Sequence, residues 1–129
     1  MLDHLTLHVK DIDRSITFYK QALAPLGYVM IKDLGAAAGF GVMSGAKKSS
    51  DPAGEFWVGK GAPHPPLVHV AFSAATRGAV GACRKAGLAA GGRDSGPPGL
   101  RERCHPDYCG AFILDPDGYN IEAVCHLPG

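Results

Sequence analysis

The stretch that decides the fold is Leu114-Asp115-Pro116-Asp117-Gly118-Tyr119-Asn120-Ile121-Glu122. Its Asp-Pro-Asp-Gly segment is a strong turn signal, because proline presets φ, aspartate bonds its own backbone and glycine can adopt positive φ. Apolar residues flank the turn on both sides, which predicts a β-hairpin. Beyond the turn, alternation places Ile121 and Glu122 on opposite faces of the strand. Glu122 must therefore face either water or a group that compensates its charge.

Length and composition limit the classes of protein to consider. The 129-residue chain is long enough for one domain, and its 46% hydrophobic and 19% charged residues indicate a globular protein. A formal net charge of +1 without a basic run gives no reason to expect nucleic acid or a membrane surface as a partner. No apolar run reaches membrane-spanning length, and Asp3 and His4 interrupt any signal-peptide pattern. We therefore expect a soluble, cytoplasmic protein.

Cysteine usage agrees with this expectation. None of the four cysteines forms a Cys-x-x-Cys pair, so they are interpreted as reduced thiols. Cys104 and Cys109 bracket a short loop that would allow a zinc site, but the sequence offers no second half-site.

The pattern of predicted elements occurs twice along the chain. In the first half the pattern predicts a strand, a helix capped by Asp11 and three strands: 2–9, 11–24, 28–32, 40–43 and 55–59. In the second half it predicts a strand, a helix capped by Thr76, a further strand and a long functional loop before the closing hairpin: 67–73, 76–86, 88–92 and 93–110. The order is β-α-β-β-β twice.

This repeat predicts an α+β fold of two βαβββ modules packed as a pseudo-twofold pair. The modules are residues 1–60 and 67–129, and the Pro-rich segment 61–66 links them within one compact domain. Each helix should cover one face of its sheet. The two sheets should then form a cupped, partly open, barrel-like surface with the helices outside.

Polar residues repeat at matching positions in the two modules. Glu55 follows His4 by 51 residues and Glu122 follows His69 by 53, each on the face opposite the apolar one. Two imidazoles and two carboxylates suit a divalent metal, which would also compensate the charge of Glu122. The sequence therefore predicts these four residues as metal ligands. For Glu55 the alternative is a solvated charge, because the register of its strand could slip by one residue.

Five further residues are candidates for binding substrate: His8, Trp57, Arg101, His105 and Tyr108. His8 shares a strand face with His4, and Trp57 shares one with Glu55. Arg101 could meet an anionic substrate, while His105 and Tyr108 could donate protons from the loop before the hairpin. The alternatives are a metal ligand for His8, a core position for Trp57 and a solvated loop surface for Arg101, His105 and Tyr108.

Three segments carry a resemblance to a known family. They are 4–11 (HLTLHVKD) with Ser15, Phe18 and Tyr19 after it, 69–72 (HVAF), and 115–122 (DPDGYNIE). Together they resemble the vicinal oxygen chelate superfamily, which includes glyoxalase I, extradiol dioxygenases, fosfomycin-resistance proteins and bleomycin-binding proteins. The resemblance covers essentially the whole chain, and it implies the paired βαβββ fold, a metal site and frequent dimerisation.

The ligand set bears on which reaction the resemblance implies. Four protein ligands on an octahedral ion leave two sites, which suits a substrate that chelates through two neighbouring oxygens. The resemblance then implies a glyoxalase-I-like lyase or isomerase, with Glu122 or Glu55 as catalytic base and Zn, Ni, Mn, Co or Fe as the metal. The expected partners are a small-molecule substrate and a second copy of the chain in a homodimer.

Two alternatives stay open at this point. If Glu55 does not bind the metal, two histidines and one carboxylate would favour a small extradiol-type dioxygenase or fosfomycin-type thiol transfer. The other alternative is a non-catalytic ligand-binding or resistance protein that uses the same pocket. The presence of all four candidate ligands counts against that alternative.

Overall fold

The computed structural model describes residues 2–101 and 105–128. The first half of the chain contains β1 (Leu5–Val9), α1 (Ile12–Ala22), the short 3-10 helix η1 (Ala24–Leu26), β2 (Val29–Asp33), β3 (Ala37–Gly41) and β4 (Phe56–Lys60). The second half contains β5 (His69–Ser73), α2 (Arg77–Ala89), β6 (Arg93–Leu100), β7 (Cys109–Leu114) and β8 (Asn120–Cys125).

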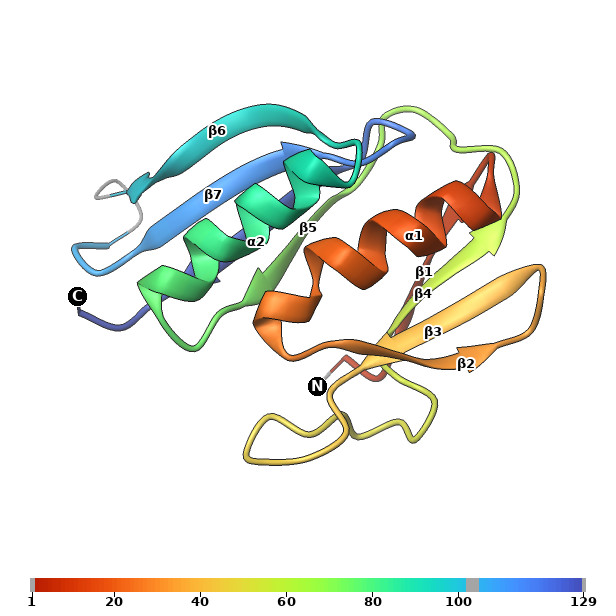
Figure 1. The fold of residues 1–129 in the computed structure, drawn as a ribbon, viewed down its shortest axis with the longest axis horizontal. Coiled ribbons are helices and arrows are strands. Elements are labelled where there is room, and N and C mark those ends of the chain that lie inside the picture. The colour runs from red at the N-terminus through yellow and green to blue at the C-terminus, as the bar shows by residue number, and fades with distance from the viewer. Residues whose placement is uncertain (1, 102–104, 129) are drawn as a thin grey trace.

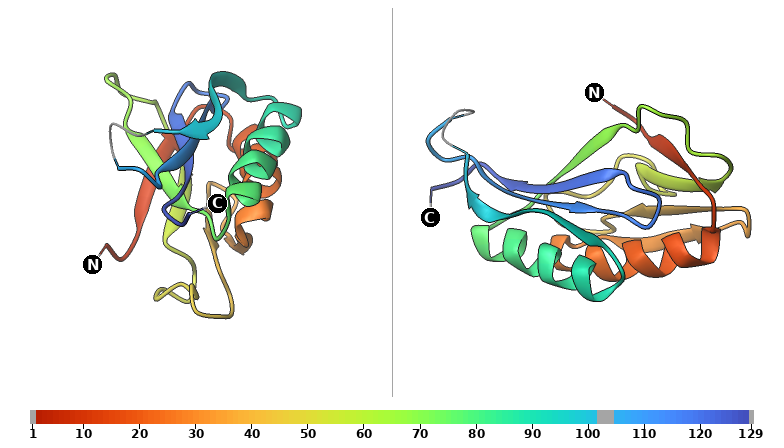
Figure 2. Two further views of the ribbon diagram at one scale, coloured as in Figure 1. Left: turned by 90° about the vertical axis from the view of Figure 1, so that its left-hand side faces the viewer. Right: turned by 90° about the horizontal axis from the view of Figure 1, so that it is seen from above.

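The strands form two four-stranded sheets with the same topology. Their orders are β1-β4-β3-β2 and β5-β8-β7-β6, with one parallel pair in each, β1 with β4 and β5 with β8 (Figure 1). Both helices lie on the same side of the two sheets and leave the opposite faces uncovered (Figure 2). The predicted α+β fold of paired modules is thus confirmed, and its sheets are cupped without closing into a barrel.

Burial follows the alternation of residues along the strands. In β1 the side chains of Leu7 and Val9 are buried whereas His8 is exposed, and in β5 Val70 is buried whereas His69 is exposed. The buried side chains form a hydrophobic core between sheets and helices. Each module therefore presents a polar strand face on the side away from its helix, as the sequence predicts.

The two helices begin at the predicted caps. The Asp11 side chain accepts a hydrogen bond from the Arg14 backbone N–H at 3.1 Å, and Thr76 accepts one from Ala79 N–H at 3.0 Å. These bonds satisfy backbone donors that have no partner within a helix.

The end of α2 differs from the prediction. The helix was predicted to end at residue 86 but continues through Gly87 to Ala89, so the predicted strand over 88–92 is wrong. Gly87 is buried inside the helix, where an added Cβ would lie 2.2 Å from Ile113 Cδ1. Because Gly87 has no side chain, the helix can pack closely against the sheet at this position. The chain reverses at Gly91, which has a φ of 104°.

The segment after α2 also corrects the prediction, because residues 93–100 form the strand β6 where a loop was expected. Pro97 and Pro98 are compatible with this strand because β6 lies at the edge of its sheet. Its pairing with β7 shifts register between Asp94 and Gly99, which accommodates the residues that cannot join the ladder.

The first strand of the first module is shorter than predicted, and its last strand is shifted by one residue toward the C-terminus. β1 begins at Leu5 and β4 begins at Phe56, so His4 and Glu55 each lie immediately before a strand. The two positions remain neighbours, since the Leu5 N–H donates to the Glu55 carbonyl at 2.8 Å.

Cys83, Cys109 and Cys125 are buried free thiols, in agreement with the predicted reduced state, whereas Cys104 lies outside the described residues. Within residues 2–101 and 105–128, no helix is long and apolar enough to cross a membrane.

The hairpin between β7 and β8 forms as predicted. Gly118 has a φ of 98°, and its N–H donates to the Asp115 carbonyl at 3.0 Å. The turn sets a register in which Leu114 pairs with Asn120 and Phe112 pairs with Glu122. This register directs Glu122 to the sheet face that the helices do not cover.

Candidate functional site

The second sheet brings His69 and Glu122 into direct contact. β5 and β8 run parallel, and His69 Nε2 lies 2.9 Å from Glu122 Oε1. The other ring nitrogen, Nδ1, lies 3.0 Å from the backbone carbonyl oxygen of Asn120. The Glu122 carboxylate is only 3% exposed, whereas the His69 side chain is 44% exposed. The pair therefore joins a buried charge to a surface imidazole.

The hydrogen-bond partners of His69 define what this pair can bind. A carbonyl oxygen only accepts, so His69 Nδ1 carries the N–H in its contact with Asn120. In the neutral imidazole, Nε2 then directs a lone pair at Glu122 Oε1, which is also an acceptor. A proton or a metal cation between the two atoms satisfies both. This donor set fits a divalent metal, because the carbonyl fixes the ring orientation that ligation by Nε2 requires.

Tyr108 completes the surroundings of Glu122. Its phenol donates a 2.5 Å hydrogen bond to Glu122 Oε2, the oxygen that His69 does not contact. The sequence predicted Tyr108 as a substrate-binding residue, whereas in the structure it contacts a predicted metal ligand. Alternation along β8 allowed the prediction that Glu122 is functional, but it carried no signal for its contact with the loop before β7.

The acidic residues Asp3 and Asp51 surround His4. His4 Nδ1 lies 2.6 Å from Asp3 Oδ1 and 3.8 Å from Asp51 Oδ2. The hydrogen bond to Asp3 raises the pKa of His4, and both carboxylates favour its charged form. Because Nδ1 faces Asp3, Nε2 is the nitrogen available to a metal, as it is in His69.

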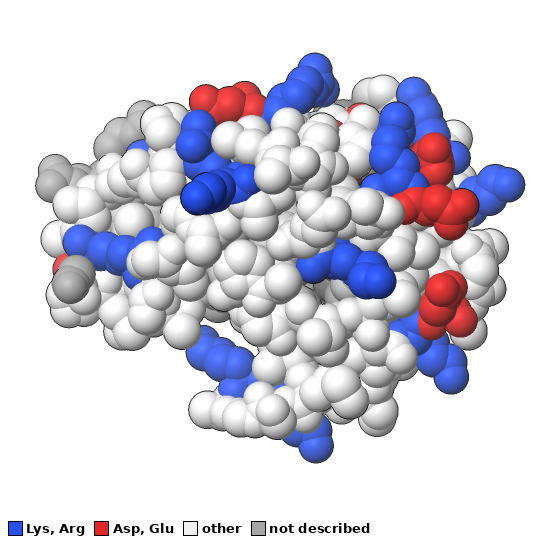
Figure 3. Space-filling model, viewed as in Figure 1, with Lys and Arg blue, Asp and Glu red and all other residues white. Residues whose placement is uncertain are grey.

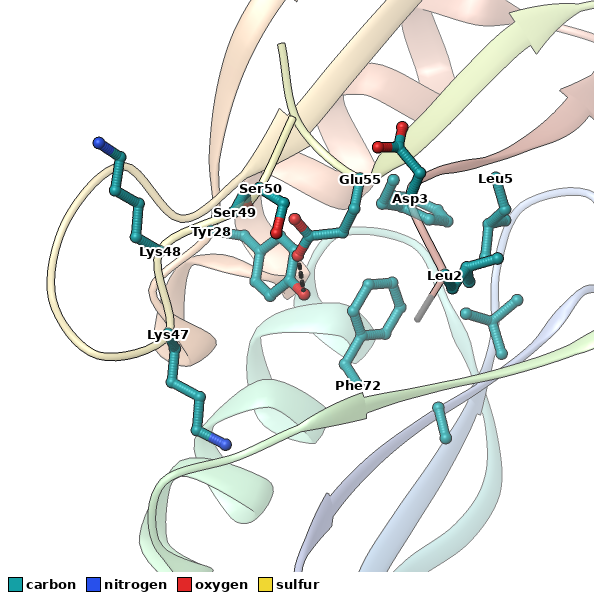
Figure 4. Close-up of a pocket in the computed structure, with 13 residues that line it drawn as sticks. Leu2, Asp3, Leu5, Tyr28, Lys47, Lys48, Ser49, Ser50, Glu55 and Phe72 are labelled. Carbon is teal, nitrogen blue, oxygen red and sulfur yellow. Dashed lines mark hydrogen bonds between the residues drawn. The ribbon is translucent and has the colours of Figure 1, made fainter. Parts of the chain in front are cut away.

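Glu55 has a different environment from Glu122. Its Oε1 accepts a 2.7 Å hydrogen bond from the Tyr28 phenol, and burial together with this bond raises the pKa of Tyr28. Both residues line a cavity of about 360 Å³ between the first module and β5, with Phe72 on its apolar side (Figure 4). Lys47 and the rest of the 47–50 loop border the same cavity.

The four predicted ligands do not converge within one chain. Of the residues described, one group of three His, Cys, Asp or Glu side chains has ligand atoms within 4.8 Å of one another, and it consists of Asp3, His4 and Asp51. His69 and Glu122 are in contact, whereas His4 and Glu55 contact other partners. No sequence pattern had marked Asp3, Asp51 or Tyr28 as a site residue. Only the adjacency of Asp3 to His4 could have signalled one of them.

The remaining substrate-binding candidates occupy separate places. His8 is exposed on β1, and its carbonyl accepts a 2.7 Å hydrogen bond from the Tyr119 phenol. Trp57 is half-buried, donates its indole N–H to the Gly54 carbonyl at 3.0 Å and packs against Gly39. Trp57 therefore lies on the face of β4 opposite the core residues Phe56 and Val58, and its role in binding substrate stays a prediction.

Arg101 and His105 lie nearer to the His69–Glu122 pair. The Arg101 guanidinium stands over the Phe112 ring, 5.3 Å from its centroid, and the His69 ring is 5.9 Å from the same centroid. The same guanidinium donates a 2.7 Å hydrogen bond to the Pro97 carbonyl, and its role in binding an anionic substrate stays a prediction. His105 instead stacks on His126, with their nitrogens Nε2 and Nδ1 2.8 Å apart. On the opposite face of the molecule, which carries the helices, charged side chains of both signs are scattered (Figure 3).

Comparison with known proteins places this geometry in context. A family model, Glyoxalase/Bleomycin resistance protein/Dioxygenase superfamily, matches residues 1–123. A solved glyoxalase/bleomycin resistance protein from Albidiferax ferrireducens is 26% identical over 95% of this chain and 96% of that chain, with a TM-score of 0.76. None of the curated proteins that were compared is significantly similar in sequence.

Two more distant structures share the fold. A glyoxalase/bleomycin resistance protein/dioxygenase family enzyme from Burkholderia phytofirmans is 17% identical over 98% of both chains, with a TM-score of 0.71. A glyoxalase I mutant from Zea mays is 24% identical over 95% of this chain and 46% of that chain, with a TM-score of 0.65.

Proposed function

Because the chain belongs to the glyoxalase/bleomycin resistance protein/dioxygenase superfamily, we propose that it is a metal-dependent enzyme resembling glyoxalase I. It would act as a lyase or isomerase on a small oxygenated substrate that chelates a divalent metal. The observation that carries the proposal is the His69–Glu122 pair. His69 Nε2 and Glu122 Oε1 are 2.9 Å apart, and the Asn120 carbonyl orients the imidazole.

The rest of the ligand set would come from a second copy of the chain. His4 and Glu55 do not meet His69 and Glu122 within one chain, and the sheet faces opposite the helices are uncovered (Figure 2). We therefore propose a homodimer in which His4 and Glu55 of one copy join His69 and Glu122 of the other. A twofold dimer of this kind contains two equivalent sites.

The two glutamates suit different tasks. Both oxygens of Glu122 have partners, His69 and Tyr108, which favours a fixed ligand. In Glu55, Tyr28 contacts Oε1, so Oε2 is the oxygen suited to take a proton from the substrate and return it. The metal, when bound, would supply Lewis-acid polarisation of a substrate oxygen. The apolar wall around Phe72 would limit the access of water to the base.

The experiment mixes two variants that each lack half of the site, His4→Ala and Glu122→Gln. Each variant alone should bind little metal. After subunit exchange, heterodimers regain one intact site, so bound metal measured by mass spectrometry should recover to roughly one quarter of the wild-type amount. Turnover of methylglyoxal with a thiol should recover in parallel. No recovery of metal despite verified exchange would contradict the shared site.

One observation favours a second candidate, a small extradiol-type dioxygenase. Glu55 lies before β4 and is hydrogen-bonded to Tyr28, so His4, His69 and Glu122 would form a two-histidine, one-carboxylate set. Oxygen uptake with catechols and Fe(II), together with unchanged metal affinity in Glu55→Ala, would support this function over the first. Stoichiometric ligand binding without turnover would instead support a non-catalytic binding protein.

A further inference from the structure

We infer that Tyr108 is a positioning residue that holds Oε2 of Glu122, so that Glu122 offers a metal only the oxygen beside His69. This inference rests on the proposed metal site and deepens it. Its structural basis is a cluster of residues that the metal-ligand prediction does not include: Tyr108, Gly110, His105 and His126.

The two oxygens of Glu122 have different partners. Oε2 accepts the 2.5 Å hydrogen bond of the Tyr108 phenol, whereas Oε1 lies 2.9 Å from His69 Nε2. When both oxygens of a carboxylate have partners, the plane of the carboxylate is fixed. A hydrogen bond to an ionised carboxylate is also among the stronger hydrogen bonds in proteins. Bidentate ligation would require Oε2 to leave Tyr108.

Gly110 on β7 provides the space for this arrangement. A Cβ added at this position would lie 2.7 Å from Glu122 Oε2 and 3.2 Å from Tyr108 Cε1. The first distance is shorter than real Cβ contacts allow, so any larger residue would displace the carboxylate or the phenol. The space that Glu122 Oε2 occupies, called the cradle below, therefore depends on Gly110 as well as on Tyr108.

Two histidines hold the Tyr108 ring in place. The ring contacts His105 and His126 edge-on, with centroid distances of 5.5 and 5.2 Å. The Asp107 backbone N–H donates to His105 Nδ1, so His105 Nε2 carries the proton that it donates to His126 Nδ1 at 2.8 Å. His105 precedes β7 and His126 follows β8, so the two chain segments at the open end of the hairpin both contact the Tyr108 ring.

The number of Glu122 oxygens that bind the metal decides how many coordination positions stay open for substrate. A carboxylate that binds through one oxygen leaves one more position open than a bidentate carboxylate does. A substrate that chelates through two oxygens needs such open positions. Tyr108 would thus keep the site accessible without touching the substrate.

The test titrates Co²⁺ into wild type and Tyr108→Phe while recording calorimetry and visible absorption. Loss of the phenol should weaken Co²⁺ binding by about 10- to 100-fold, the usual cost of losing an outer-shell partner. The visible bands of Co²⁺ should also weaken, because bidentate ligation raises the coordination number. Gly110→Ala should change affinity and spectrum in the same direction by filling the cradle.

Tyr119→Phe is the matched control, because its phenol donates to the His8 carbonyl in β1 of the other sheet and not to a predicted metal ligand. Its Co²⁺ affinity should stay within about twofold of wild type, since no outer-shell partner of a ligand is lost. Wild-type affinity and spectrum in Tyr108→Phe would overturn the inference and leave the metal site intact. An equal loss in Tyr119→Phe would also overturn it. Wild type that binds no Co²⁺ would overturn the proposed metal site itself.

Discussion

Tyr19 in α1 donates its phenolic hydrogen to Oδ2 of Asp115 in the β7–β8 turn, a buried hydrogen bond between residues 96 positions apart. The other oxygen of Asp115 accepts from the backbone N–H groups of Asp117 and Tyr119, both at 2.9 Å. Burial raises the pKa of both Tyr19 and Asp115. The turn that sets the register of Glu122 is thus fastened to the helix of the other module.

Replacing Asp115 should destabilise the fold strongly. Asp115→Ala removes the acceptor of three donors, and the expected loss in free energy of unfolding is about 3 kcal/mol. Tyr19→Phe, which removes one of these bonds, should cost about 1 to 2 kcal/mol. Urea denaturation at one fixed protein concentration measures both. A smaller loss in Asp115→Ala than in Tyr19→Phe would contradict this account of the turn.

Asp94 should make stability depend on pH in a defined direction. The Gly96 N–H and then Arg84, 3.1 Å away, lower the pKa of this carboxyl below its ordinary value. Because the folded-state pKa is lower than the unfolded one, the contribution of Asp94 is present above the unfolded pKa. It is lost as pH falls through the folded pKa.

The measurement compares the thermal unfolding of wild type and Asp94→Asn between pH 3 and pH 7. The variant should be slightly less stable near pH 7, and the difference should shrink as the solution becomes acidic. Salt should reduce it as well, since Asp94 is exposed. A difference that grows toward pH 3 would refute the assigned sign.

Gly54 should not tolerate substitution, because its backbone has a positive φ and an added side chain would collide with the Phe40 backbone. Its φ is 98°, and an added Cβ would lie 2.2 Å from the Phe40 carbonyl oxygen. Gly45 is the matched control, with a φ of 89° and nothing within 4 Å of the added Cβ. Gly45→Ala should cost about 1 kcal/mol, whereas Gly54→Ala should cost several times as much. Equal losses in chemical denaturation would show that the contact with Phe40 does not matter.

Metal should stabilise the protein only through the predicted ligands. At 100-fold excess over the dissociation constant, bound Zn²⁺ or Ni²⁺ should add about 2.7 kcal/mol, and a chelator should remove it. His69→Ala and Glu122→Gln should lose most of this gain in a thermal-shift measurement. Lys32→Gln, in a strand without a predicted ligand, should keep it. Retention of the full gain in Glu122→Gln would exclude Glu122 as a ligand.

Sequence periodicity was enough to predict the architecture. Alternation in 5–9 and 69–73 indicated which strand faces are buried, and Asp11, Thr76 and the 115–118 turn marked the ends of elements. These signals are local, because a strand face or a cap depends on residues a few positions apart. β6 escaped prediction because its two prolines indicate a loop, and only pairing with β7 makes it an edge strand.

The sequence by itself thus determined two repeated modules and placed Glu122 and His69 on the open face of the second one. Only the tertiary structure decided that Tyr108 holds Glu122, that Tyr28 holds Glu55 and that Asp3 and Asp51 surround His4. The physical reason is range. Backbone geometry repeats every two or 3.6 residues and so shows in the sequence, whereas contacts between remote segments depend on how the modules and loops pack.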